Sequence, residues 1–230
     1  MKKSLLEITP GKSGSVFCFL LVLFLGTSPL AKAQALSGLN PTKKIPLLPK
    51  LYVGIKIGSN FSYLSGNNWS NGVKSNMLGG VFAGIKGLGF GAQAEGLFEQ
   101  SEYTTGNGFY GLYKDYYNRN SDSLKQGTFR VTKLSLPLLL QFKVAKLFWL
   151  QTGVQFYGIV SVHDFNGLVK DSKALFRSGN TAGVIGTAFH FRNADIGARA
   201  IFDFQNLNNI SSADVWRQYM LQAHIGLKLF

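Results

Sequence analysis

The chain has 230 residues and combines 27 Gly and 46% hydrophobic residues with only 15% charged residues. This composition excludes a disordered chain and a coiled coil, and a single Cys excludes a disulfide scaffold or a Cys-rich zinc site. Lys and Arg number 24 against 11 Asp and Glu, and the length is ordinary for one sandwich or barrel domain.

Residues 1–33 have the anatomy of a secretory signal peptide. A basic start precedes an uninterrupted apolar run at 16–25, and the segment closes with the small-x-small pattern Ala31-Lys32-Ala33. A transmembrane helix needs about 20 apolar residues, so this shorter run favours a cleaved signal peptide over the alternative of an uncleaved anchor. We expect cleavage after Ala33, with Ala35 as the alternative, and export of a cysteine-free chain that begins with an extended lead-in at 34–51.

From residue 52 onward, apolar and polar side chains alternate with a period of two, which is typical of strands with two different faces. Five segments alternate cleanly and three alternate less cleanly. The sequence therefore predicts eight strands, at 52–64, 77–86, 90–103, 129–144, 147–162, 176–191, 193–205 and 216–230.

The connections between these strands alternate between short and long. Hairpin-sized turns lie at 87–89, 145–146 and 192–193, whereas long polar connections lie at 65–76, 104–127, 163–173 and 205–215. A soluble sandwich has no reason for this order, but an outer-membrane barrel combines short periplasmic turns with longer outside loops. The pattern predicts an all-β, eight-stranded, antiparallel up-and-down transmembrane barrel over 52–230, with the lead-in 34–51 in the periplasm.

The two strand faces differ in charge. The apolar face carries almost no charge over stretches long enough for a tilted strand to cross a bilayer. The other face carries acidic and basic residues in nearly equal numbers, and side chains are expected to fill the interior of an eight-stranded barrel. We expect a charge network in the lumen, formed by Lys56, Glu95, Glu99, Lys133, Arg199, Asp203 and Lys228, with Lys143 and Asp195 on the same face.

A secreted, soluble, lipocalin-like ligand-binding barrel is the alternative, because it has the same strand count and alternation but turns its apolar face inward. Aromatic residues near the strand ends favour the membrane barrel, since interface girdles lie there. The residues assigned to these girdles are Phe61, Tyr63, Phe98, Tyr103, Phe129, Phe142, Phe148, Trp149, Phe202, Phe204, Trp216 and Tyr219.

Three segments resemble a known family. Leu134-Ser135-Leu136-Pro137-Leu138-Leu139-Leu140-Gln141-Phe142 resembles a characteristic strand of the PorT-like outer-membrane β-barrel proteins of Bacteroidota. The stretch from Tyr52 to Ser62 resembles the first strand of that family, and the stretch from Ile225 to Phe230 resembles its terminal strand, which ends in an aromatic residue. The likeness covers about 52–230 and implies an outer-membrane location and barrel architecture. It implies no particular activity, because the family is functionally mixed.

The long connection at 104–127 is the strongest candidate for a contact site. Connections of this length are uncommon unless they are functional or disordered, and Tyr with Gly and Asn is typical of adaptable binding surfaces. We expect either an outward contact site for a glycan, protein or surface polymer, or a loop that folds over its own barrel mouth. The aromatic residues that would form the contact loop are Phe109, Tyr110, Tyr113, Tyr116 and Tyr117.

No catalytic, cofactor or metal site emerges from the motifs. The three histidines have no metal-ligand spacing, and no nucleophile elbow, P-loop or zincin motif occurs. His163-Asp164, near Ser161, is a poor dyad, because adjacent residues on a strand point to opposite sides. We therefore expect a protein that is not an enzyme and has no cofactor.

The charge distribution indicates the expected partners. Without residues 1–33, the chain has 20 Lys and Arg against 10 Asp and Glu, but its longest basic run is Lys43-Lys44, so nucleic acid is not expected. Outer-membrane lipid or lipopolysaccharide, the barrel-assembly machinery, and an envelope protein or surface glycan are the expected partners. A structural or interaction role, within an envelope or secretion assembly, and a small pore or transporter are the two functions that this barrel could serve.

Overall fold

A computed structural model describes residues 49–230 except 71, 119–125, 212 and 230. The expected signal peptide and most of the lead-in lie outside the described residues. Within the described part of the chain, no helix is both long enough and apolar enough to cross a membrane.

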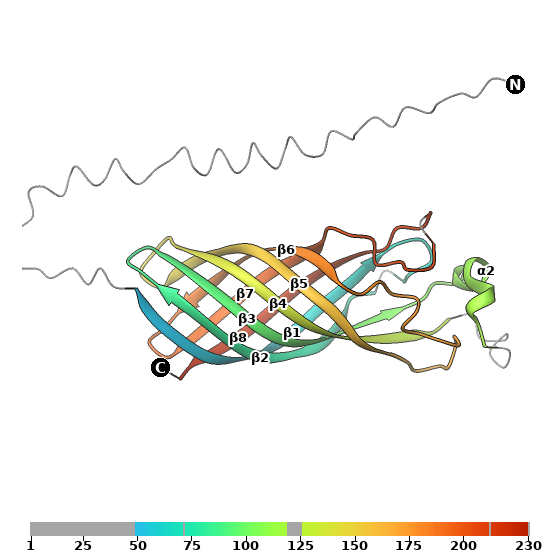
Figure 1. Ribbon diagram of the computed structural model, residues 1–230, viewed down its shortest axis with the longest axis horizontal. Coiled ribbons are helices and arrows are strands. Elements are labelled where there is room, and N and C mark those ends of the chain that lie inside the picture. The colour runs from blue at the N-terminus through green and yellow to red at the C-terminus, as the bar shows by residue number, and fades with distance from the viewer. Residues whose placement is uncertain (1–48, 71, 119–125, 212, 230) are drawn as a thin grey trace, which may run out of the picture. The chain divides into compact units, whose positions relative to one another are not determined.

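Eight antiparallel strands form a closed barrel in which each strand pairs with its neighbours in sequence, and β1 pairs with β8 (Figure 1). The predicted fold of eight antiparallel, up-and-down strands is confirmed. The strands are β1 (Lys50–Ser65), β2 (Lys74–Lys86), β3 (Phe90–Thr104), β4 (Thr128–Lys143), β5 (Phe148–Asp164), β6 (Asn180–His190), β7 (Ala194–Asp203) and β8 (Arg217–Lys228).

The connections alternate as predicted, with short turns at one end of the barrel, called here the turn end, and long loops at the other, the loop end. The sixth strand begins at Asn180 rather than at 176, so the loop before it covers 165–179. The loop at 105–127 contains the short helices α2 (Phe109–Tyr113) and η3 (Lys114–Tyr116), and Figure 1 shows α2 beyond the loop ends of the strands.

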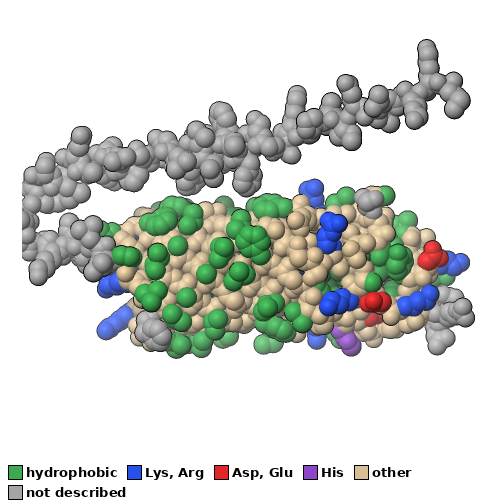
Figure 2. All heavy atoms as spheres, viewed as in Figure 1, with side chains coloured by type: hydrophobic (Ala, Val, Ile, Leu, Met, Phe, Trp, Pro, Cys, Tyr) green, Lys and Arg blue, Asp and Glu red, His purple; other side chains and the backbone are tan. Residues whose placement is uncertain are grey.

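The alternation of side chains fixes the two barrel surfaces. On β1, Ile57 is 65% exposed on the outer face, whereas its neighbour Lys56 is 3% exposed in the interior. Leu134, Leu136 and Leu138 are exposed on the outer face of β4, between buried inward residues. The outer surface is thus apolar over most of the strand length, and Figure 2 shows hydrophobic side chains spread over one side of it.

Pro137 lies in the middle of β4 and interrupts one ladder of hydrogen bonds. Proline has no backbone N–H to donate, and the β3–β4 pairing passes from Ala94 with Leu138 to Leu97 with Ser135 without pairs between them. The β4–β5 pairing continues through Pro137, so the closed sheet is kept.

The interior has two layers. Toward the turn end it is polar and charged, and toward the loop end it is a hydrophobic core built around Trp69, Phe109, Phe129, Phe176 and Trp216. Four aromatic residues assigned above to interface girdles lie inside the barrel or under its loops, so that assignment was wrong for them. They point inward because they share the inward alternation of their strands or belong to the core: Tyr103, Phe129, Trp149 and Trp216.

Candidate functional site

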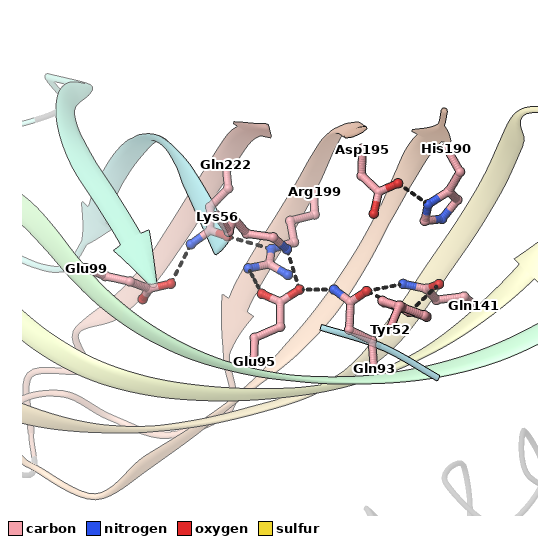
Figure 3. A network of polar contacts seen from close by, with 10 residues as sticks. All are labelled: Tyr52, Lys56, Gln93, Glu95, Glu99, Gln141, His190, Asp195, Arg199 and Gln222. Carbon is pink, nitrogen blue, oxygen red and sulfur yellow. Dashed lines mark hydrogen bonds and ion pairs between the residues drawn. The ribbon is translucent and has the colours of Figure 1, made fainter. Parts of the chain in front are cut away.

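A carboxylate from β3 forms the centre of the polar layer. Glu95 is 1% exposed and accepts hydrogen bonds from the ammonium group of Lys56 on β1 and from Arg199 Nη2 on β7, the latter at 2.9 Å (Figure 3). Gln93 donates a further bond to Glu95 at 2.6 Å. Three strands are therefore tied across the lumen by one compensated charge cluster, because a buried carboxylate is tolerated only when it is paired and hydrogen-bonded.

One amide, that of Gln222, links this cluster to a second carboxylate. Arg199 Nε donates to Gln222 at 2.5 Å, and Gln222 donates to Glu99 Oε1 at 2.7 Å. Ser135 and Gln155 donate to the other oxygen of Glu99 at 2.7 and 3.1 Å. Glu99 is thus held by hydrogen bonds from neutral groups on β4, β5 and β8.

A third cluster lies nearer the turn end. Asp195 contacts His190 Nδ1 at 2.5 Å and Lys228 Nζ at 2.6 Å. Tyr52 donates to Gln93 at 2.9 Å, which brings β1 and β3 together between this cluster and Glu95. In Figure 3, Glu99, the Glu95 cluster and the Asp195–His190 pair follow one another from left to right along the inside of the barrel.

A fourth group lies closer to the loop end. Lys133 Nζ donates to Gln218 at 2.8 Å and lies 4.8 Å from the centre of the Tyr157 ring. Tyr157 donates to Asp203 at 2.7 Å. The nearest partners of Lys133 are thus neutral, and its positive charge is compensated at longer range by the carboxylates of Glu99 and Asp203.

The structure places all seven residues of the predicted charge network in the lumen, but distributes them among these four groups. Lys143, expected on the same face, is exposed at the rim because β4 ends there. The predicted network contained only charged residues and did not include the neutral residues that link them. Their inward alternation with the charged residues was the available signal: Gln93, Gln141, Gln155 and Gln222.

The chemistry of the lumen is that of a packed polar core. Among the described residues, no group of three or more His, Asp or Glu could hold a metal ion. Arg199 Nη1 and His224 Nδ1 are buried without a hydrogen-bond partner, and both lie beside the Glu95 cluster. The long inward side chains of this layer are almost completely buried, which is what filling of the lumen requires.

The barrel mouth is closed by loops that meet at one carboxylate. Asp214 is 6% exposed and accepts hydrogen bonds from Tyr113 at 2.7 Å, from the Trp216 indole at 2.9 Å and from the backbone N–H of Asn67 at 3.2 Å. These residues belong to, or adjoin, three different loops. Trp69 packs edge-to-face on Trp216 with ring centres 5.0 Å apart. We call this assembly of loops the cap.

The five aromatic residues of the expected contact loop occupy different positions. Phe109, Tyr113 and Tyr117 are 0, 4 and 3% exposed and belong to the hydrophobic core under the cap. Tyr110 is half-buried and Tyr116 is 40% exposed. This is the arrangement of a loop that folds over its own barrel mouth, and it leaves Tyr116 and part of Tyr110 on the surface.

Burial in the cap changes the ionisation of two tyrosines. Removal from water, with a smaller effect of the Asp164 charge, raises the pKa of Tyr117 to about 12. Burial, followed by the hydrogen bond to Asp214, also raises the pKa of Tyr113. Both hydroxyls stay neutral in the folded cap well above pH 10.

The residues considered as a dyad have local structural roles. Asp164 accepts hydrogen bonds from the backbone N–H groups of Asn166 and Val169, each at 3.0 Å, and so shapes the start of the 165–179 loop. His163 packs edge-to-face on Phe165, with ring centres 4.8 Å apart.

Comparison with protein families and with characterised proteins finds no match. Among solved structures, the chain is similar to Neisserial surface protein A, with 11% identity, a TM-score of 0.46, and coverage of 77% of this chain and 97% of that chain. It is also similar to Ail, the attachment invasion locus protein of Yersinia pestis, solved in complex with the heparin analogue sucrose octasulfate. That match has 11% identity, a TM-score of 0.43, and coverage of 78% of this chain and 99% of that chain. The fold itself is established by the strand pairing of this chain.

Proposed function

We propose that the protein is an integral outer-membrane β-barrel with a structural or interaction role and no enzymatic activity. One observation carries the proposal: the outer face of the closed barrel is apolar over the middle of its strands, while the charged residues in that part of the strands are buried inside. These buried residues are Lys56, Glu95, Glu99, Lys133, Arg199 and Asp203. Exposed apolar rows are costly in water, and a bilayer is the solvent that matches them.

The same observation argues against a lipocalin-like carrier. Such a barrel keeps an apolar, ligand-sized interior, whereas this lumen holds Glu95, Arg199 and Lys56 at its centre, paired with one another. The aromatic layer above them is filled by the side chains of the barrel and its cap. Over the described residues, the interior is therefore packed differently from the apolar ligand cavity of a lipocalin.

A small pore is the second candidate function, because eight-stranded barrels with polar interiors can contain water. Two stacked layers, one polar and one aromatic, oppose it, since each is closed by interlocking side chains. A role within an envelope or secretion assembly fits better, with the cap as the outward surface. The resemblance of 52–230 to PorT-like barrels of Bacteroidota and the expected signal peptide support the outer-membrane location.

Cell fractionation and surface labelling test the proposal. The protein should fractionate with outer membranes and show a heat-modifiable band shift on gels. An epitope tag inserted at Asn107, which is exposed in the cap loop, should be labelled on intact cells. A tag at Gly87, in the β2–β3 turn, should be labelled only after the membrane is opened. Recovery in the soluble periplasm would contradict the proposal, and equal labelling of the two tags would contradict the orientation.

A further inference from the structure

The turn end of the barrel carries a ring of basic residues. Among the described residues, six Lys and Arg lie in or beside the three turns and at the two barrel termini, and Asp195 is the acidic residue there. Asp195 is 5% exposed and already paired with His190 and Lys228. Four members of this basic ring are exposed: Lys50, Lys143, Lys146 and Arg192. The other two are at the mouth of the lumen: the ammonium of Lys86 lies 4.0 Å from the centre of the Trp149 ring, and that of Lys228 is paired with Asp195.

The rest of the described charge is nearly balanced. In the lumen, Lys56, Lys133 and Arg199 face Glu95, Glu99 and Asp203. At the loop end, basic residues are interspersed with Glu102, Asp115, Asp164, Asp171 and Asp214. The excess positive charge of the described chain is therefore concentrated at the turn end.

The ring surrounds the barrel rather than forming a patch on one side. Because the sheet is closed in the order β1 to β8, the β2–β3, β4–β5 and β6–β7 turns and the β8–β1 junction lie at successive quarters of the circumference. The basic residues of the four quarters are, in this order, Lys86, Lys143 with Lys146, Arg192, and Lys50. A partner that matches this distribution must be negatively charged all around the barrel, which describes a lipid headgroup layer better than an acidic face of a soluble protein.

Each quarter of the ring also presents an exposed apolar side chain. Leu88 is 69% exposed beside Lys86, Val144 is 59% exposed beside Lys143, and Phe191 is 45% exposed beside Arg192. At the fourth quarter, Leu51 and Leu229 are 67 and 62% exposed. Cations next to apolar groups at the tips of turns fit the boundary between hydrocarbon and headgroups, where the apolar group enters the bilayer and the cation stays at the phosphate level.

We infer that the basic ring binds the anionic headgroups of phospholipids in the leaflet that meets the turn end. The inference rests on the proposed membrane location and adds the lipid class and the residues that select it. Basic residues near an anionic surface contribute about 1 kcal/mol each, which corresponds to about a fivefold preference for an anionic over a zwitterionic headgroup at an occupied position.

Spin-labelled lipids test this inference. The protein is folded in phosphatidylcholine bilayers. The association constant of spin-labelled phosphatidylglycerol for its first lipid shell should then be up to about fivefold higher than that of spin-labelled phosphatidylcholine. The preference should disappear in roughly 1 M salt, where the screening length is about 3 Å. It should also disappear in a variant with Lys50→Gln, Lys143→Gln, Lys146→Gln and Arg192→Gln, which changes only exposed side chains.

A matched control removes the same charge from exposed residues at the loop end: Lys114→Gln, Lys170→Gln, Lys173→Gln and Arg177→Gln. This variant should keep the preference. Loss of the preference in the control instead of the ring variant would overturn the inference. Equal association of both lipids with the wild-type protein would also overturn the inference. That result would favour an acidic soluble protein as the partner of the basic ring. Failure to fold into any bilayer, seen as an absent heat-modifiable band, would instead contradict the proposed membrane location.

Discussion

Glu95 and Glu102 lie seven positions apart on β3, and each pairs with an arginine, but their surroundings are opposite. Glu95 is buried between Lys56 and Arg199, whereas Glu102 meets Arg130 at 2.6 Å on the partly exposed outer surface. Removing one partner of a buried pair leaves an uncompensated charge in the interior, while exposed pairs contribute little. The two sites therefore allow the same substitution to be compared on one strand.

Glu95→Gln should destabilise the folded barrel by about 3–5 kcal/mol, because two cations lose their shared carboxylate. Glu102→Gln should cost about 1 kcal/mol or less. Urea unfolding in detergent micelles, followed by the gel band shift, measures both values. Similar stability of the two variants would show that the lumen pair contributes no more than a surface pair.

Ile225 tests the outward face at single-residue resolution. It is 47% exposed on β8 and lies on the same face as Tyr219, which stands nearer the loop end beside Arg217. Ile225→Arg should cost about 2–4 kcal/mol if the residue lies near the bilayer midplane, and Tyr219→Arg about 0–1 kcal/mol near the interface. Folding yield into lipid vesicles is the measurement, and equal yields would contradict the assigned membrane position of β8.

At the scale of elements, the cap is a small folded unit built from loops that are distant in sequence. Asp214 connects the 66–73, 105–127 and 204–216 loops, and Trp69 and Trp216 pack beneath them. The hydroxyl of Tyr117 is buried there without a hydrogen-bond partner. Since ionisation of that hydroxyl would place a charge in an apolar site, the cap should respond to alkaline pH.

The sign of this response follows from the raised pKa. The pKa of an unfolded tyrosine is about 10, whereas burial raises the pKa of Tyr117 to about 12. The stability that comes from the neutral Tyr117 hydroxyl is therefore present in full below pH 10 and is lost as the pH rises from 10 through 12. The loss attributable to Tyr117 should reach about 2 kcal/mol at pH 12. Quenching of tryptophan fluorescence by acrylamide would report the opening of the cap.

Tyr117→Phe is the matched control for this prediction. It removes the titrating hydroxyl and breaks no hydrogen bond of that group, so the cap should open less between pH 10 and pH 12 than in the wild-type protein. An unchanged alkaline profile in the variant would assign the transition to other groups.

At the scale of the whole molecule, the barrel is closed by two layers in series. The Glu95 cluster lies in the lumen toward the turn end, and the aromatic core lies under the cap toward the loop end. We expect either layer alone to stop ion flow, because the interior of an eight-stranded barrel is just wide enough to be filled by side chains. The two functions, interaction barrel and pore, therefore differ in a measurable conductance.

The wild-type protein should be silent in planar bilayers. The pair Glu95→Ala with Arg199→Ala, which changes no net charge, should also be silent, and so should Phe129→Ala with Trp216→Ala. Combining all four substitutions should produce conductance, provided that the variant still shows the band shift. Steady conductance of the wild-type protein would instead favour the pore, and a silent combined variant that folds would mean that other side chains close the lumen.

The strand count, the order of turns and loops, and the assignment of residues to the inner or outer face were determined by the sequence alone. These features are local: a period of two places Lys56 opposite Ile57, whatever the rest of the chain does. The same rule, applied to the strand ends, places Tyr103, Phe129 and Trp149 inside the barrel, as the structure shows. The girdle assignment had instead placed them on the outer face.

Only the tertiary structure decided which inward residues meet. Glu95 pairs with Arg199, 104 positions away, and Tyr113 with Asp214, 101 positions away. Alternation fixes the face of a residue but neither its partner across the lumen nor its height along the barrel, because these depend on the register of all eight strands and on closure between β1 and β8. The division of the interior into polar and aromatic layers, and the folding of the loops into a cap, follow from that closure, since only a closed barrel brings these distant side chains within contact distance.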